Sequence, residues 1–529
     1  MATESSSTPT TPPPRAQWGT RTGFLLAAIG SAIGLGNIWR FPSEAYKNGG
    51  GAFLLPYLIA LLTAGLPLLV LEYTLGRRYR KSPPGAFRRL SGPAQAIGWW
   101  QVAVSFVIAA YYAVILAWAV RYVGFSVGEQ WGDDPNAYFF GDFLRTAEQP
   151  GWISSYVGGV FWPLLVIWIA VLAVLALGVR RGIEMANRIF IPLLVVFFVV
   201  LVVRAVTLDG AGTGLDALFS PDWGALAEGG VWVAAYGQIF FSLSVGFGIM
   251  ITYASYLRRR ADLTGSALVA GFANSSFELL AGIGVFATLG FLSAASGTPV
   301  GETVTDGIGL AFIAFPTIIS NMPLGTLFGL LFFGSLVIAG FTSLISIVEV
   351  VVASVQDKTG IGRIPAVLGA GGLTALVSVL LFPTDSGLYL LDSADHFINR
   401  YGIALASLVA VIVVAWVLRR LPALQRDADA TSAIRLGVWW RLALGVVTPL
   451  VLGWMMVDSL RSEFDENYGG YPSGFLFWSG WAVALGALLF GVLASLLPWP
   501  RGTEPAGTEP SGPGGPVESR PGMPGEGRH

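Results

Sequence analysis

Apolar runs long enough to cross a membrane, separated by short polar segments, make up most of the chain. A helix of about 20 predominantly apolar residues spans the roughly 30 Å of hydrocarbon in a bilayer. The pattern predicts twelve spans, near residues 20–45, 51–76, 97–125, 160–178, 188–207, 231–257, 264–292, 325–355, 364–382, 396–418, 437–459 and 472–497. A further apolar stretch, 307–320, is short and contains Pro316, so we expect it to form an extracellular cap.

Two of these runs are interrupted by small and polar residues, at 30–37 (GSAIGLGN) and at 241–248 (FSLSVGFG). Every backbone N–H and C=O group in hydrocarbon needs a partner, so such an interruption persists only where protein or a water-filled cavity surrounds it. The freed carbonyls can coordinate a cation, and a helix N-terminus can receive an anion. The two segments lie about 210 residues apart, which fits an internal repeat. We therefore expect one binding site near the membrane midplane.

Composition supports a polytopic helical membrane protein. The 529 residues are 54% hydrophobic and only 12% charged, about half the ~25% charged residues of soluble domains, and the mean hydropathy is +0.66. The net charge of −1 gives no reason to expect a nucleic-acid partner. The chain has no cysteine, which excludes disulfides and thiolate-bound metals, and its two histidines argue against a histidine-based metal centre.

The charges of the loops predict the orientation in the membrane. Segment 128–150 carries five acidic residues and one basic residue, Arg145. The loops expected on the opposite side are rich in basic residues: Arg15, Arg21, Arg77, Arg78, Arg80, Lys81, Arg88, Arg89, Arg180, Arg181, Arg258, Arg259, Arg260, Lys358, Arg363, Arg419, Arg420 and Arg426. By the positive-inside rule this side is cytoplasmic, and an even number of spans leaves both termini there. Segments 1–14 and 501–529 have the composition of disordered tails.

Five stretches of sequence carry a resemblance to a known family. They are 18–21 (WGTR), 34–42 (GLGNIWRFP), 48–53 (NGGGAF), 238–248 (QIFFSLSVGFG) and 252–256 (TYASY). With them the chain resembles the neurotransmitter:sodium symporter family, in its bacterial leucine-transporter branch, over about residues 15–400. The resemblance implies an all-α polytopic membrane protein with 12 transmembrane helices. Its core would be a 5+5 inverted repeat, 15–210 and 211–420, with broken helices 1 and 6, and two extra helices in 421–500.

The resemblance also implies two sodium sites. The first would use Ala32, Asn37, Ser242 and Asn274. The second would use Gly30, Ile33, Ala339, Thr342 and Ser343. Carbonyl, amide and hydroxyl oxygens suit a hard cation, and Ser242 keeps the hydroxyl of the threonine usual in the family. Taken alone, each small residue could instead simply let two helices pack closely.

The solute site implied by the resemblance is that of an amino acid. The amides of Leu35 and Gly36 with the Tyr112 hydroxyl would bind its carboxylate, and carbonyls around Ala32, Phe241 and Ser244 its ammonium group. On its own, Tyr112 could equally be an interfacial tyrosine. The side-chain space would be bounded by Ile108, Phe247, Ser343, Leu344 and Ile347. This lining carries no charge, so we expect a small or medium neutral amino acid.

Two acidic residues fall inside predicted spans. Glu278 lies one helical turn after Asn274 on the same face, and a carboxyl group at membrane depth is by default functional. Chloride-dependent relatives carry a neutral residue there, so the resemblance implies that Glu278 substitutes for chloride and leaves proton counter-transport open. The alternative is a structural, hydrogen-bonded glutamate. Glu72 is expected to hold the amides exposed at the breaks, where unpaired N–H groups are costly.

The resemblance further implies an extracellular gate. Arg40 and Asp395 would form its ion pair, with Gln238 and Phe247 as a lid beneath. Asp392 is the alternative acid to Asp395. Exposed ion pairs contribute only about 0–1 kcal/mol, which suits a gate that must open.

A cytoplasmic gate would be formed by Arg15 and Asp357, with Tyr256 nearby. Glu349 stands where the family usually has glutamine, and the sequence suggests no role for it.

These features together predict a sodium-coupled symporter that imports a small or medium neutral amino acid by alternating access, without chloride, in the cell membrane. Its partners would be two sodium ions, the solute and the bilayer. The alternative is a non-transporting amino-acid sensor on the same scaffold. An enzyme is not expected, because no nucleophile–base constellation or metal cluster occurs and segment 30–37 lacks the features of a phosphate loop.

Overall fold

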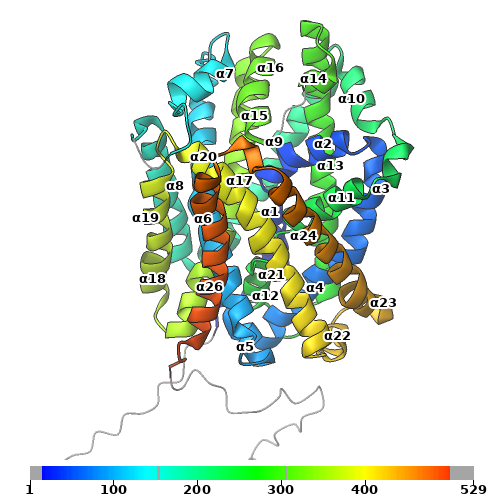
Figure 1. Ribbon diagram of the computed structural model, residues 1–529, viewed down its shortest axis with the longest axis vertical. Helices are drawn as coiled ribbons and strands as arrows, with labels where there is room; N and C mark the ends of the chain where they lie inside the picture. Colours follow the sequence, from blue (N-terminus) through cyan, green and yellow to red (C-terminus); the bar gives the residue numbers. More distant parts are fainter. Residues whose placement is uncertain (1–14, 152–154, 304–306, 501–529) are drawn as a thin grey trace, which may run out of the picture.

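The structure, a computed structural model, describes residues 15–151, 155–303 and 307–500. Nearly all of these residues lie in helices, and within these ranges the only β-type pairing is two isolated bridges. Most long helices run along the long axis of the molecule and pack side by side (Figure 1). The predicted tails, 1–14 and 501–529, lie outside the described residues.

The predicted apolar runs form the long helices, because a helix satisfies its own backbone groups in hydrocarbon. The main helices are α1 (Arg21–Ala32), α2 (Leu35–Lys47), α3 (Leu54–Ala60), α4 (Leu66–Tyr79), α5 (Pro83–Leu90), α6 (Gln95–Phe125), α8 (Gly158–Ala176), α9 (Glu184–Val206), α10 (Ala211–Phe219), α11 (Gly229–Ser242), α12 (Ile249–Ala254), α13 (Leu263–Ser296), α16 (Phe315–Asn321), α17 (Gly325–Thr359), α18 (Arg363–Ala366), α19 (Gly372–Leu381), α20 (Gly387–Phe397), α21 (Leu405–Ile412), α22 (Leu421–Asp429), α23 (Gly437–Leu442), α24 (Thr448–Asp465) and α26 (Ala482–Leu496). Short π-helical turns join several of them into longer spans, such as α3 to α4 through 61–65.

Ten helical spans in the described residues are long and apolar enough to cross a membrane, or eleven if α1 and α2 count as one bent span. The twelve predicted spans are therefore not all recovered by this criterion. The difference lies in the predicted sixth span, because residues 243–248 divide it into α11 and α12, both too short to cross alone. The stretch Gly307–Asn321 forms a shorter apolar helix and is not among the spans long enough to cross.

Local signals fix several helix ends. The Thr20 hydroxyl accepts a hydrogen bond from the Gly23 N–H and caps the start of α1, and Asp262 caps α13 in the same way. Such caps satisfy N–H groups that the first turn leaves free. Gly360 ends α17 in a left-handed conformation (φ 73°) that glycine adopts without strain.

Several short helices lie at the two ends of the bundle. In Figure 1, α7 (Pro135–Ala137), α10 and α16 lie at one end, whereas α5 and α22 lie at the other. Arg88 and Arg89 in α5 and Arg426 in α22, three of the basic residues named above, belong to the second end. This is the end that the loop charges predict to be cytoplasmic.

The tenth span begins earlier than predicted. It runs from Gly387 to Val417, whereas the apolar pattern places its start at residue 396. α20 carries the half-buried Asp392 and Asp395 and the buried His396, and these polar residues mask the start of the span in the sequence. The most enclosed spans are α6 and α17, which pack against each other at the centre of the bundle.

Candidate binding site at the helix breaks

The first interruption breaks a span, as the sequence predicts. α1 ends at Ala32, Ile33 and Gly34 are extended, and α2 begins at Leu35 at an angle of 54° to α1. The Asn37 side chain caps the new helix by accepting a hydrogen bond from the Gly34 N–H (2.9 Å). The carbonyls at the end of α1 are thereby freed from the helical ladder.

The second interruption is longer and contains three residues with positive φ: Ser244 (53°), Gly246 (91°) and Gly248 (88°). A Cβ atom at Gly246 would collide with Ser407 Oγ, so the close approach requires glycine. The Gly246 N–H donates to Glu72 Oε1 (2.7 Å), and Glu72 is buried. The Gly246 amide, which the break leaves outside the helical ladder, thus has a carboxylate partner on α4.

The two breaks lie side by side at the centre of the molecule. Ser244 Oγ donates to the Ser31 carbonyl (2.8 Å), which joins the second break to the end of α1. Gly36 packs directly against the ring of Phe241, and no larger residue would fit there. Segments more than 200 residues apart thus present their free peptide groups to a common region.

The five residues predicted for the second sodium site surround one cluster of oxygens between α1 and α17. Thr342 Oγ1 lies 3.1 Å from the Gly30 carbonyl and 3.0 Å from the Ala339 carbonyl. Ser343 Oγ lies 3.3 Å from the carbonyls of both Gly30 and Ile33. Two hydroxyls and three carbonyls in this arrangement suit a hard cation.

Three of the four residues predicted for the first sodium site form a buried chain of hydrogen bonds. Asn37 Nδ2 donates to Asn274 Oδ1 (2.8 Å), and Asn274 Nδ2 donates to Ser242 Oγ (3.1 Å). These residues come from α2, α13 and α11, and the fourth predicted residue, Ala32, is the last residue of α1. The chain brings amide and hydroxyl groups of both breaks to one place.

The residues predicted to bind the solute flank the breaks. Tyr112 Oη, from α6, accepts a hydrogen bond from the Leu35 N–H at the start of α2 (3.4 Å). Ser105, two turns earlier on α6, donates to the Phe247 carbonyl (2.7 Å). The apolar side chains predicted to bound the site are all buried: Ile108, Phe247, Leu344 and Ile347.

Glu278 is fully buried on α13. Its carboxylate accepts hydrogen bonds from the Tyr57 hydroxyl and from Gln238 Nε2 (2.6 Å). The sequence predicts Gln238 as part of an outer lid, but here Gln238 is buried and its amide contacts Glu278. These hydrogen bonds connect the acid on α13 to α3 and α11.

The predicted cytoplasmic pair is in contact. Arg15 Nη1 pairs with Asp357, and its guanidinium lies 4.9 Å from the centre of the Tyr256 ring. Asp357 also accepts from Lys81 Nζ (3.3 Å) and from the Ser82 N–H (2.7 Å). These contacts tie the segment before α1 to α17 and to the start of α5.

The predicted extracellular pair is not in contact. Arg40 pairs with Glu44 on its own helix (3.6 Å) and lies over the Phe241 ring (4.8 Å). Asp395 accepts instead from Tyr111 Oη (2.7 Å) and Asn399 Nδ2 (2.8 Å). In this structure each of the two charged groups has other partners.

Asp392, the alternative acid, is held elsewhere. It accepts from the hydroxyls of Tyr468 (3.0 Å) and Tyr471 (2.8 Å), which follow α24.

Glu349, for which the sequence suggests no role, has well-defined partners. Its buried carboxylate accepts from Arg363 Nη1 (2.8 Å) and Nη2 (2.6 Å) and from Tyr256 Oη (2.6 Å). Because Tyr256 also contacts Arg15, this pair adjoins the cytoplasmic contacts. In the sequence, this pair is indicated only by an acid inside a span with an arginine 14 residues later, and that signal is weak.

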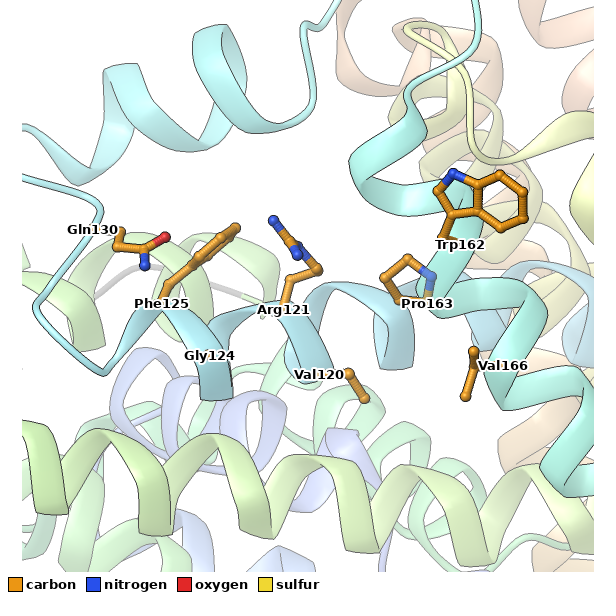
Figure 2. Close-up of a pocket in the computed structure, with 8 residues that line it drawn as sticks. All are labelled: Val120, Arg121, Gly124, Phe125, Gln130, Trp162, Pro163 and Val166. Carbon is orange, nitrogen blue, oxygen red and sulfur yellow. The ribbon is translucent and has the colours of Figure 1, made fainter.

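A surface hollow lies apart from these residues. Figure 2 shows it between α6 and α8, lined by Val120, Arg121, Gly124, Phe125, Gln130, Trp162, Pro163 and Val166. None of the predicted site residues contributes to it. Trp162 and Val166 are exposed, so the hollow faces outward from the bundle.

Comparison with known proteins assigns the family. A family model described as "Sodium:neurotransmitter symporter family" matches residues 15–149 and 133–501. An uncharacterized sodium-dependent transporter of Methanocaldococcus jannaschii is 40% identical over 91% of this chain and 98% of its own length. The sodium-dependent dopamine transporter of Bos taurus is 29% identical over 93% of this chain and 75% of its own length.

A solved structure is similar as well. The crystal structure of MhsT in complex with L-phenylalanine matches 84% of this chain and all of its own, with a TM-score of 0.71 and 32% identity. The all-α, polytopic fold is thus shared with this solved structure. The chain belongs to the sodium:neurotransmitter symporter family and is a sodium-dependent membrane transporter rather than an enzyme.

Proposed function

We propose that this sodium-dependent transporter imports a small or medium neutral amino acid together with two sodium ions. The observation that carries the proposal is the meeting of the two breaks, where Ser244 bonds to the carbonyl of Ser31 at the end of α1. Peptide groups freed from both helices can there bind the carboxylate and ammonium groups of one amino acid. The L-phenylalanine bound to MhsT supports this class of solute.

The side-chain end of the solute would lie among uncharged residues. Ile108, Phe247, Leu344 and Ile347 are buried and apolar, and Ser343 adds only a hydroxyl. A charged side chain would lose its hydration there without gaining a partner. We therefore expect alanine, valine or leucine to be transported, and aspartate, glutamate, lysine and arginine to be rejected.

Two oxygen clusters would hold the sodium ions. The first comprises Ala32, Asn37, Ser242 and Asn274, and the second comprises Gly30, Ile33, Ala339, Thr342 and Ser343. Both clusters join a broken helix to an unbroken one, α13 or α17. Binding of sodium would therefore stabilise the arrangement of the breaks that the solute requires.

We propose that transport does not require chloride. Glu278 is buried one turn from Asn274 and would supply the negative charge itself. Its hydrogen bonds from Tyr57 and Gln238 keep the carboxylate oriented.

The charged groups on either side of the site would act as gates. The contact of Arg15 with Asp357 would close the cytoplasmic side, whereas Arg40 and Asp395 would meet when the extracellular side closes. Alternation between these contacts, with the inverted repeats 15–210 and 211–420 moving against each other, would carry the solute inward. Both termini would then be cytoplasmic, in the cell membrane.

Uptake of labelled amino acids into proteoliposomes tests this function. An inward sodium gradient should drive accumulation of leucine, valine or alanine, equally in chloride and in gluconate. Uptake restricted to tryptophan, or accumulation independent of sodium, would refute the proposed solute or coupling. Sodium-dependent binding without any accumulation would favour the alternative, a non-transporting amino-acid sensor.

A further inference from the structure

One buried side-chain oxygen beside the second oxygen cluster, Asn187 Oδ1, has no hydrogen-bond partner among the described residues. Asn187, on α9, is 0% exposed. Its Nδ2 donates to the Ile183 carbonyl one turn earlier (2.9 Å), whereas Oδ1 has no partner among the described residues. A buried acceptor left unpaired is unfavourable, so the presence of this one calls for an explanation.

The free oxygen is directed at α1. A Cβ atom at Gly30 would collide with Asn187 Oδ1 and with the Ile191 side chain, so glycine lets the amide approach the backbone of α1. Cα–Cβ bonds of a helix tilt toward its N-terminus. The amide therefore lies on the Arg21 side of Gly30, between the oxygen cluster and the proposed cytoplasmic end. α9 packs against both α1 and α17, the two helices that form the cluster.

Acceptor oxygens continue along the same face of α9. Glu184, one turn before Asn187, is buried and accepts from the Gly19 N–H (2.7 Å) and from Thr20 Oγ1 (3.1 Å). Arg188 pairs with Glu184 (3.1 Å) and reaches the surface, with 40% of its side chain exposed. A line of oxygens thus leads from Gly30 to the start of α1.

We propose that Asn187 Oδ1 is a transient ligand for the second sodium ion as it leaves between α1 and α9 for the cytoplasmic side. This rests on the proposed function, which assigns a sodium ion to the cluster around Thr342 and Ser343. The Ile191 side chain, which packs beside Asn187 against Gly30, offers no ligand to a partly dehydrated cation. One amide oxygen on this path lowers the energy barrier to sodium release, although it is not a ligand of the second sodium site.

The test separates sodium release from the other steps of transport. Net uptake driven by a sodium gradient requires release of sodium inside, whereas solute exchange at equal, saturating sodium on both sides does not. Asn187→Leu keeps the shape of the side chain and removes the oxygen. The ratio of net uptake to exchange should fall about tenfold, the effect of roughly 1.4 kcal/mol on the barrier. An unchanged ratio would overturn the proposal.

A matched control is Thr374→Val on α19, which also removes a buried polar group, one that bonds to the Ala370 carbonyl of its own helix (2.9 Å). Its ratio of net uptake to exchange should equal that of the wild type.

Asn187→Asp supplies a second test, which remains available if the leucine variant does not fold. It keeps an oxygen and adds charge, so the half-saturating sodium concentration should fall, and an unchanged value would count against the proposal.

The wild type distinguishes failure of this inference from failure of the proposed function. If wild-type protein accumulates solute with sodium and the Asn187 variants behave identically, only the role of Asn187 is wrong. If the wild type shows no sodium-driven accumulation, the proposed function is wrong and this inference falls with it.

Discussion

Replacement of Glu278 by serine tests the charge balance of the proposed first sodium site. The carboxylate is fully buried and is held by Tyr57 and Gln238, so it cannot turn toward solvent. It lies four residues after Asn274 on α13. The substitution removes one negative charge from beside the cation and leaves space where an anion can bind.

The size of the effect follows from the helix geometry. Four residues of an α-helix rise about 6 Å. Two opposite unit charges about 6 Å apart attract by roughly 3 kcal/mol at an effective dielectric constant near 20. Because every 1.4 kcal/mol is a factor of ten, Glu278→Ser should weaken sodium binding about 100-fold when no anion replaces the carboxylate.

The assay measures the half-saturating sodium concentration for leucine uptake in chloride and in gluconate. The wild type should give one value in both anions. The half-saturating sodium concentration of Glu278→Ser should rise strongly in gluconate and return close to the wild-type value in chloride. Asp392→Asn is the control, because its carboxylate is held by Tyr468 and Tyr471 away from the proposed site. Equal sodium dependence of Glu278→Ser and wild type in both anions would refute the reasoning.

Three further substitutions probe other parts of the account. Asp357→Asn removes the acid that holds the cytoplasmic contacts and should reduce sodium-driven uptake at least severalfold; normal uptake rates would contradict its role as a gate. Gly246→Ala places a Cβ against Ser407 at positive φ, and should lower thermal stability by about 1–3 kcal/mol; an unchanged melting temperature would show that the break can relax. Arg363→Met leaves the Glu349 charge buried and unpaired, at a cost of about 3–5 kcal/mol. The double variant with Glu349→Gln should recover most of that stability, and no recovery would contradict direct pairing.

The broken spans could be predicted from the sequence because their signals are local. Glycine and polar residues inside an apolar run, such as Gly34 and Gly246, mark the places where a helix cannot continue. The positions of Asn37, Asn274 and Ser242 were predictable only through the family resemblance, because residues from three helices meet there.

The pairing of charges could not be predicted in the same way. Arg40 lies in a motif of the family, yet in this structure it pairs with Glu44 and contacts Phe241 rather than Asp395. The partner of a long side chain depends on how helices distant in sequence are placed, and several acceptors lie within reach of Arg40.

Contacts that arise only when two helices pack together also could not be predicted from the sequence. Asn187 looks like an ordinary polar residue near the end of a span. Its approach to Gly30 becomes apparent only when α9 is packed against α1. The partnership of Glu349 with Arg363 likewise depends on the turn between α17 and α18.

The most direct test of the central claim is equilibrium binding of labelled leucine to the purified protein in sodium and in potassium. If free peptide groups at the two breaks hold sodium and solute side by side, binding should be saturable in sodium and lost in potassium. Equal binding in both cations would contradict the account.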